Sequence, residues 1–306
     1  MSLPSDRFTG VLAAALTPQT ADFIPDEKLM SKHCNWLLDN GCDGLAILGT
    51  TGEANSFCLK ERIRVIEGLV EAGVPGEKLM PGTGSCALTD AVSLTKVAVN
   101  VGARGVLMLP PFYYKNPSDD GLFAYYSEVI QRVGDSRLRV YLYHFPQMSA
   151  TPISYNLIEM LLKAYPDTVV GMKDSSGVLD NMVGAAKNFP GFCVLSGADD
   201  YLLPLLEQGG GGCITACSNV SSPLASAIYQ GFQAGEDVSS VHETLVKVRI
   251  AVSQSPYPAA LKALMARHSG NDSWLNLRPP LQNLNGEQTD ALFSAFDAID
   301  YQMPAV

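Results

Sequence analysis

The chain has 306 residues, of which 47% are hydrophobic and 17% are charged, so it can bury a large core and is not a disordered chain. Its formal net charge of −10 disfavours nucleic acid and anionic membranes as partners, because like charges repel, and a small-molecule substrate is favoured. Because no stretch reaches the roughly 18 apolar residues of a membrane span and the first residues lack a secretory signal pattern, we expect a cytoplasmic protein.

Short apolar runs alternate with segments of helical periodicity along most of the chain. The predicted strands cover residues 10–16, 44–48, 79–83, 105–109, 139–143, 168–172, 192–195 and 213–216. The helices predicted to follow them cover residues 26–40, 59–72, 90–101, 120–133, 154–164, 179–188, 200–207 and 223–233. Strands that are apolar throughout are typical of a parallel sheet covered on both faces. Eight such units in about 250 residues predict an α/β protein of the (β/α)₈ or TIM barrel class.

The last part of the chain shows helical periodicity without further strands. Helices are predicted at residues 239–253, 257–268 and 287–299. We therefore predict a catalytic barrel at residues 1–235 and a C-terminal helical extension at residues 236–306. The glycine run at residues 209–212 precedes the eighth strand, so we interpret it as a tight turn in preference to a phosphate-binding loop.

Lys173 and Tyr143 are the candidate catalytic residues, because each stands where a predicted strand ends. The carboxyl ends of barrel strands share one rim, and these two residues belong to neighbouring strands. Desolvation at a buried strand end favours the neutral amine, which can attack a carbonyl and form a Schiff base, and a nearby phenol can move protons. The residues alone leave two alternatives open, a lysine that extends into water and a tyrosine that only packs in the core.

A loop of two threonines between glycines, residues 49–53, follows the second predicted strand. Its backbone N–H groups and hydroxyls can bind an anion without a cation. The alternative is an ordinary turn.

Eight sequence motifs are spread along nearly the whole chain, each occurring once. They are GTTGE at 49–53, PPFYYKNPSDDGLFAYY at 110–126, LYHFP at 142–146, GMKDSSG at 171–177, SGADD at 196–200, GCITACSN at 212–219, SPYPAALKALM at 255–265 and LRPPL at 277–281. Together they resemble the dihydrodipicolinate synthase / N-acetylneuraminate lyase family of pyruvate-dependent class I aldolases. The resemblance implies a barrel enzyme, a lyase that acts on pyruvate or another 2-oxo acid and needs no cofactor beyond a covalent Schiff base.

The resemblance also implies roles for particular residues. Lys173 would form the imine and Tyr143 would shuttle protons. Thr51 would link Tyr143 to Tyr114, which would reach in from a neighbouring subunit of a homotetramer built as a dimer of dimers.

The same resemblance implies which groups hold pyruvate. Thr50 and Thr51 would bind its carboxylate. Gly197 and Ile214 would frame it through backbone groups.

The distal part of the site departs from dihydrodipicolinate synthases. Those enzymes carry an arginine for the carboxylate of aspartate semialdehyde at the position of Met148. Asp199 and Asp200 align with the acidic pair that sialic acid lyases use on sugar hydroxyls, and Ser175 aligns with a nearby hydroxyl residue. We expect acceptors without a fixed cation here, because carboxylates suit hydroxyls and repel carboxylates.

These departures favour aldol cleavage or condensation of a 2-oxo-3-deoxy sugar acid. The alternatives within the family are dihydrodipicolinate synthase, a Schiff-base dehydratase and 4-hydroxy-2-oxoglutarate aldolase.

Two other classes of protein are alternatives to a Schiff-base aldolase. A metal-dependent aldolase needs a ligand cluster at the rim, but only His144 lies near it, and strand alternation turns that side chain outward if Tyr143 faces inward. The seven cysteines are scattered without CxxC spacing, so no metal site is predicted and reduced core cysteines are expected. A non-catalytic binding protein of the same fold is the second alternative.

Overall fold

The computed structural model describes residues 3–306. Within them, seven parallel strands form one sheet in the order β2-β1-β7-β6-β5-β4-β3, with every strand residue buried. The strands are β1 (Gly10–Ala13), β2 (Gly44–Leu45), β3 (Val106–Met108), β4 (Val140–His144), β5 (Val169–Asp174), β6 (Cys193–Ser196) and β7 (Gly212–Thr215).

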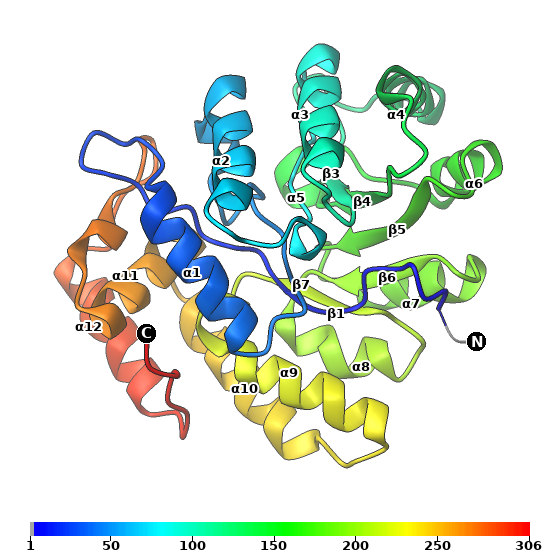
Figure 1. Ribbon diagram of the computed structural model, residues 1–306. Coiled ribbons are helices and arrows are strands. Elements are labelled where there is room, and N and C mark those ends of the chain that lie inside the picture. Colours follow the sequence, from blue (N-terminus) through cyan, green and yellow to red (C-terminus); the bar gives the residue numbers. More distant parts are fainter. Residues whose placement is uncertain (1–2) are drawn as a thin grey trace.

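Helices surround this curled sheet, as Figure 1 shows. They are α1 (Glu27–Asp39), α2 (Leu59–Glu71), α3 (Leu88–Asn100), α4 (Asp119–Val133), α5 (Pro146–Ser149), α6 (Tyr155–Ala164), α7 (Leu179–Asn188), α8 (Leu202–Leu206), α9 (Ser218–Ala234), α10 (Ser239–Ser253), α11 (Tyr257–Ser269) and α12 (Gly286–Asp297). The predicted helices are confirmed within a few residues. The short helix α5, directly after β4, was not predicted.

The prediction of a third strand at residues 79–83 is wrong, because this segment forms only isolated bridges to its neighbours. Pro81 lies in its middle and has no N–H to donate. The segment nevertheless contacts both edges of the sheet: Met80 donates to the carbonyl of Leu45 in β2, and Thr83 donates to that of Leu107 in β3, at 2.8 and 3.0 Å. The segment therefore lies between the two edge strands.

Strand side chains alternate between two cores. Tyr141, Tyr143, Leu195 and Ile214 pack together in a cluster inside the curl of the sheet. Met172 packs outward with side chains of the surrounding helices. Successive residues of a strand point to opposite faces, so the lysine that follows Met172 points inward.

The last helices form a further apolar cluster with α9. Helix α10 packs on α9 and α12, and Trp274, just after α11, is a buried member of the cluster. The predicted helical extension is thus confirmed as helical, while its status as a separate domain stays a prediction. No helix among residues 3–306 is long and apolar enough to cross a membrane.

Candidate active site

Lys173 lies one residue before the end of β5 and is only 5% exposed. The parallel register places it beside Tyr143 of β4 and Leu195 of β6. Its Nζ lies 4.6 Å from the centroid of the Tyr143 ring. The two candidate catalytic residues are therefore adjacent, with both side chains directed into the curl of the sheet.

The Tyr143 hydroxyl shares a hydrogen bond of 3.3 Å with Thr50 Oγ1. Within the chain this contact is made by Thr50, and the predicted role of Thr51, a link from Tyr143 to Tyr114 of a neighbouring subunit, stays a prediction. Thr51 is itself buried at 7% exposure and stays a predicted ligand of the carboxylate. A phenol that has a hydroxyl partner on one side and an amine near its ring can pass a proton between substrate and partner.

The loop that carries the threonines, residues 49–53, has an unusual backbone. Leu48 precedes it and Glu53 is its last residue, and both adopt the left-handed conformation, with φ of 53° and 55°. This costs about 1–2 kcal/mol for a non-glycine residue, so surrounding contacts must hold the loop in place. The Glu53 N–H donates to the Thr50 carbonyl at 3.1 Å, and a side chain at Gly49 would point into open space.

The ends of β5 and β6 approach each other closely at Gly197. A Cβ there would lie 2.0 Å from Ser175 Oγ and 2.7 Å from the Asp174 carbonyl, so only glycine fits. The Gly197 N–H donates to the same Asp174 carbonyl at 2.7 Å. Ile214 of β7 lies in the inner cluster with Tyr143. The structure thus brings these predicted residues to neighbouring strands, and their contacts with substrate stay predictions.

The two distal acids are held by a cation, Arg249 of α10. Its Nε lies 2.7 Å from Asp200 Oδ1, and its Nη1 lies 4.0 Å from Asp199 Oδ2. The expectation of a distal site without a fixed cation is therefore wrong. Asp199 is fully buried and accepts a hydrogen bond of 2.7 Å from Thr215. Burial raises its pKa, although Thr215 and Arg249 oppose the shift.

Met148 and Tyr114 project from this chain into solvent. Met148, on α5, is 60% exposed, and Tyr114, on the loop between β3 and α4, is 81% exposed. The Tyr114 ring packs edge-to-face on Tyr113 with centroids 5.2 Å apart. The roles predicted for these residues, in the distal site and in a neighbouring subunit, stay predictions.

His144 is buried and faces away from the inner cluster. Its Nδ1 accepts a hydrogen bond of 3.0 Å from the Ile153 N–H, and β5 places Asp174 beside it. Burial lowers the pKa of His144, while Asp174 opposes the shift. Within residues 3–306, no three histidine, cysteine or carboxylate side chains gather as metal ligands do. The expectation of a metal-free enzyme stays a prediction.

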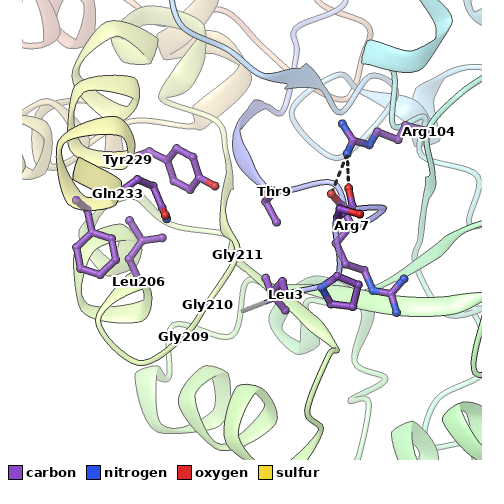
Figure 2. Close-up of a pocket in the computed structure, with 13 residues that line it drawn as sticks. Leu3, Arg7, Thr9, Arg104, Leu206, Gly209, Gly210, Gly211, Tyr229 and Gln233 are labelled. Carbon is purple, nitrogen blue, oxygen red and sulfur yellow. Dashed lines mark hydrogen bonds between the residues drawn. The ribbon is translucent and has the colours of Figure 1, made fainter. Parts of the chain in front are cut away.

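A cavity of about 390 Å³ lies at the opposite end of the sheet (Figure 2). Thr9, Arg104 and Gly211, which line it, directly precede or lie near the starts of β1, β3 and β7. The Arg104 guanidinium donates to backbone carbonyls, including that of Arg7 at 3.0 Å, as the dashed lines in Figure 2 show. Because Lys173 and Tyr143 lie at the other ends of their strands, this cavity is not the candidate active site.

Comparisons with known proteins agree with the motifs. The model of the dihydrodipicolinate synthetase family matches residues 7–299. An uncharacterized DapA-like lyase of Chloroflexus aurantiacus is 35% identical over 95% of this chain and 96% of its own. The crystal structure of dihydrodipicolinate synthase from Agrobacterium tumefaciens has a TM-score of 0.88 and 30% identity, covering 96% of this chain and 100% of that one.

A third relative was solved with a ligand. The E. coli K12 prophage protein YagE, of the dihydrodipicolinic acid synthase family, was crystallised in complex with pyruvate. Its structure has a TM-score of 0.86 and 25% identity, covering 95% of this chain and 98% of that one.

Proposed function

This chain belongs to the dihydrodipicolinate synthetase family, and from that membership we propose that it is a Schiff-base lyase acting on a 2-oxo acid through Lys173. Carbon–carbon lyase activity that depends on pyruvate is the activity of the family. The observation that carries the Schiff-base assignment is the buried Lys173 amine, 4.6 Å from the centroid of the Tyr143 ring, whose hydroxyl reaches Thr50. A closed (β/α)₈ barrel belongs to the same proposal, supported by the contacts of residues 79–83 with both edge strands.

The first step joins Lys173 to the substrate. Nζ attacks the keto carbon, a C–N bond forms, and the carbonyl electron pair moves to oxygen, which takes up the proton that the amine nitrogen loses. A second proton on this oxygen lets the C–O bond break with release of water, while the nitrogen lone pair forms the C=N bond of the protonated imine. The Thr50–Thr51 loop would hold the substrate carboxylate, because the Thr50 hydroxyl contacts Tyr143 and hydroxyls and backbone N–H groups can bind an anion.

The second step breaks or makes the carbon–carbon bond. In the cleavage direction, a base removes the proton from the C4 hydroxyl, the C3–C4 bond breaks, and its electron pair moves into the imine to give an enamine and an aldehyde. Protonation of C3 and hydrolysis then release pyruvate. Tyr143 is the group in position for these proton transfers, with Thr50 as its hydroxyl partner.

For the substrate we propose a 2-oxo-3-deoxy sugar acid. One guanidinium, Arg249, faces two acids, Asp199 and Asp200, so the cluster has no surplus positive charge for a second carboxylate. Asp200 retains 35% exposure of its side chain and can accept a hydrogen bond from a hydroxyl. Asp199, fully buried, supports Thr215 instead.

We expect Asp200→Asn to raise the KM for the sugar acid about tenfold, the effect of one lost hydrogen bond to a charged group. The concentration of pyruvate that half-saturates imine formation should stay within about twofold, because Asp200 contacts only the distal part of the substrate. Steady-state kinetics and adduct formation measure the two quantities. Asp167→Asn, an exposed acid before β5 at the other end of the sheet, is the matched control.

The alternative substrate is pyruvate with aspartate semialdehyde, and Arg249 is the observation that favours it. A guanidinium released from Asp200 could bind the second carboxylate. Condensation with aspartate semialdehyde faster than with every sugar-derived aldehyde tested, and lost in Arg249→Gln, would establish this alternative. Dehydration and cleavage of 4-hydroxy-2-oxoglutarate are further chemistries of the same imine and belong in the same panel.

The predicted homotetramer and cytoplasmic location belong to the proposal too. The exposed rings of Tyr113 and Tyr114 support association, because a large apolar surface is costly to leave in water.

A further inference from the structure

Lys262 of α11 and Glu53, the last residue of the loop at residues 49–53, form a buried ion pair. Lys262 Nζ lies 2.5 Å from Glu53 Oε1, and both side chains are fully buried. The two residues are 209 positions apart in the sequence. The pair therefore ties the C-terminal extension to the end of the loop that carries Thr50 and Thr51.

The remaining polar atoms of the pair are also engaged. Glu53 Oε2 accepts from Gln19 Nε2 at 2.8 Å and from the Arg278 N–H at 3.4 Å. Lys262 Nζ donates to the Asn276 carbonyl at 2.8 Å. The Asn276 side-chain amide donates in turn to the Gln19 carbonyl at 2.9 Å. This network joins three segments around one carboxylate, so Glu53 has little freedom to move.

Stability alone is a weak reason for such a pair. Removing two charges from water costs free energy, and well-packed apolar residues in place of a buried ion pair are often as stable or more so. Burial lowers the pKa of Lys262, which reflects this cost, and Glu53 opposes the shift. A buried pair does, however, select one geometry, because its hydrogen bonds are directional.

The loop at residues 49–53 has a backbone conformation that must be held by its surroundings. Glu53 has φ of 55°, a conformation that a non-glycine residue keeps only when its surroundings enforce it. Its N–H donates to the carbonyl of Thr50, whose hydroxyl contacts Tyr143. A shift of Glu53 would therefore move the partner of the candidate acid-base residue.

We propose that Glu53 and Lys262 are positioning residues that hold the Thr50–Thr51 loop in the conformation needed to bind the substrate carboxylate. The inference rests on the proposed function for what the loop binds. The claim that the ion pair fixes the loop is independent of the substrate.

The chain offers a matched control in a second ion pair of the same extension. Arg278 pairs with Glu61 in the first turn of α2, and its guanidinium also donates to the Ser56 carbonyl. This pair also bridges the extension to the segment after β2, but its carboxylate makes no contact with residues 49–53 among the hydrogen bonds of the described chain. Glu61→Gln thus weakens a second, less buried bridge from the extension and leaves the Glu53–Lys262 pair in place.

The experiment compares Glu53→Gln with Glu61→Gln by two readouts. Amide hydrogen exchange of residues 49–53 should accelerate about tenfold or more in Glu53→Gln and change little in Glu61→Gln. The pyruvate concentration that half-saturates borohydride trapping should rise by about ten- to a hundredfold in Glu53→Gln only, since small misplacements of binding groups have effects of this size. Equal effects of the two variants on both readouts would overturn the proposal.

The double variant Glu53→Gln/Lys262→Met separates an effect on loop position from an effect on stability. The same measurements are made on it if Glu53→Gln alone does not fold. It removes both charges, so no buried charge is left unpaired and the thermal midpoint should recover toward that of the wild type. If the pair has a positioning role, the amide exchange rate of the loop and the pyruvate concentration that half-saturates trapping should remain raised in the double variant. If both return to their wild-type values together with the thermal midpoint, the pair has a structural role only. If the wild type forms no adduct at all, the proposed function fails, and the loop exchange alone decides the positioning role.

Discussion

Replacement of Lys173 by alanine is expected to abolish turnover, with a loss on the order of 10⁴- to 10⁶-fold, as for other covalent nucleophiles. The amine is the atom that bonds to the substrate, and among residues 3–306 Lys173 is the only lysine that lies in a strand. Its side chain is 5% exposed, beside Tyr143 and Leu195. Release of pyruvate from the preferred sugar acid measures the loss.

The control for this variant is Lys187→Ala, in the last turn of α7. It removes a lysine from the same strand–helix unit but from an exposed position outside the sheet. Lys187→Ala should retain the activity of the wild type. Turnover by Lys173→Ala within about tenfold of the wild type would rule out covalent catalysis by this residue.

Tyr143→Phe is expected to lower kcat by about 10²- to 10⁴-fold, the usual contribution of a general acid-base group. The variant keeps the ring beside Lys173 and loses only the hydroxyl that contacts Thr50. Adduct formation with pyruvate should persist at a reduced rate, because the nucleophile is intact. Single-turnover kinetics separate the rate of adduct formation from that of the later steps.

Tyr141→Phe is the matched control, since Tyr141 lies two residues earlier on the same strand and in the same inner cluster. Its hydroxyl accepts a hydrogen bond of 2.6 Å from the Phe8 N–H, a contact at the other end of the strand. We expect it to lose about 1–3 kcal/mol of stability and to keep turnover per folded molecule. Equal losses of kcat in both variants would remove Tyr143 from the proton transfers.

Much of the fold could be predicted because its strands are short apolar runs and its helices have clear periodicity. The third strand failed for a local reason: Pro81 cannot donate to a neighbour, so the segment contacts both edge strands without becoming a regular strand. The charged cluster after β6 was predicted only in part, because its two acids were identified and its arginine was not. Asp199 and Asp200 stand in a sequence motif, whereas Arg249 reaches them from a helix of the extension, and single-sequence periodicity does not place such a contact.

Two contacts of the loop at residues 49–53 could not be predicted from the sequence either, because they depend on tertiary structure. Which threonine contacts Tyr143 depends on how the loop turns, and the left-handed residues at its ends set that turn. The partner of Glu53 is Lys262, the single charge within a run of small and apolar residues at 259–266. A lone lysine on an apolar helix indicates a buried partner, but the sequence does not name it.

Borohydride reduction of the wild-type enzyme in the presence of pyruvate, followed by peptide mapping, tests directly whether Lys173 forms a Schiff base. A reduced adduct is expected on Lys173, formed in a pyruvate-dependent way and absent from Lys173→Ala. Activity should be lost in proportion to labelling. An adduct on a different lysine, or full turnover of the sugar acid without any adduct, would contradict the claim that this site works through a Schiff base on Lys173.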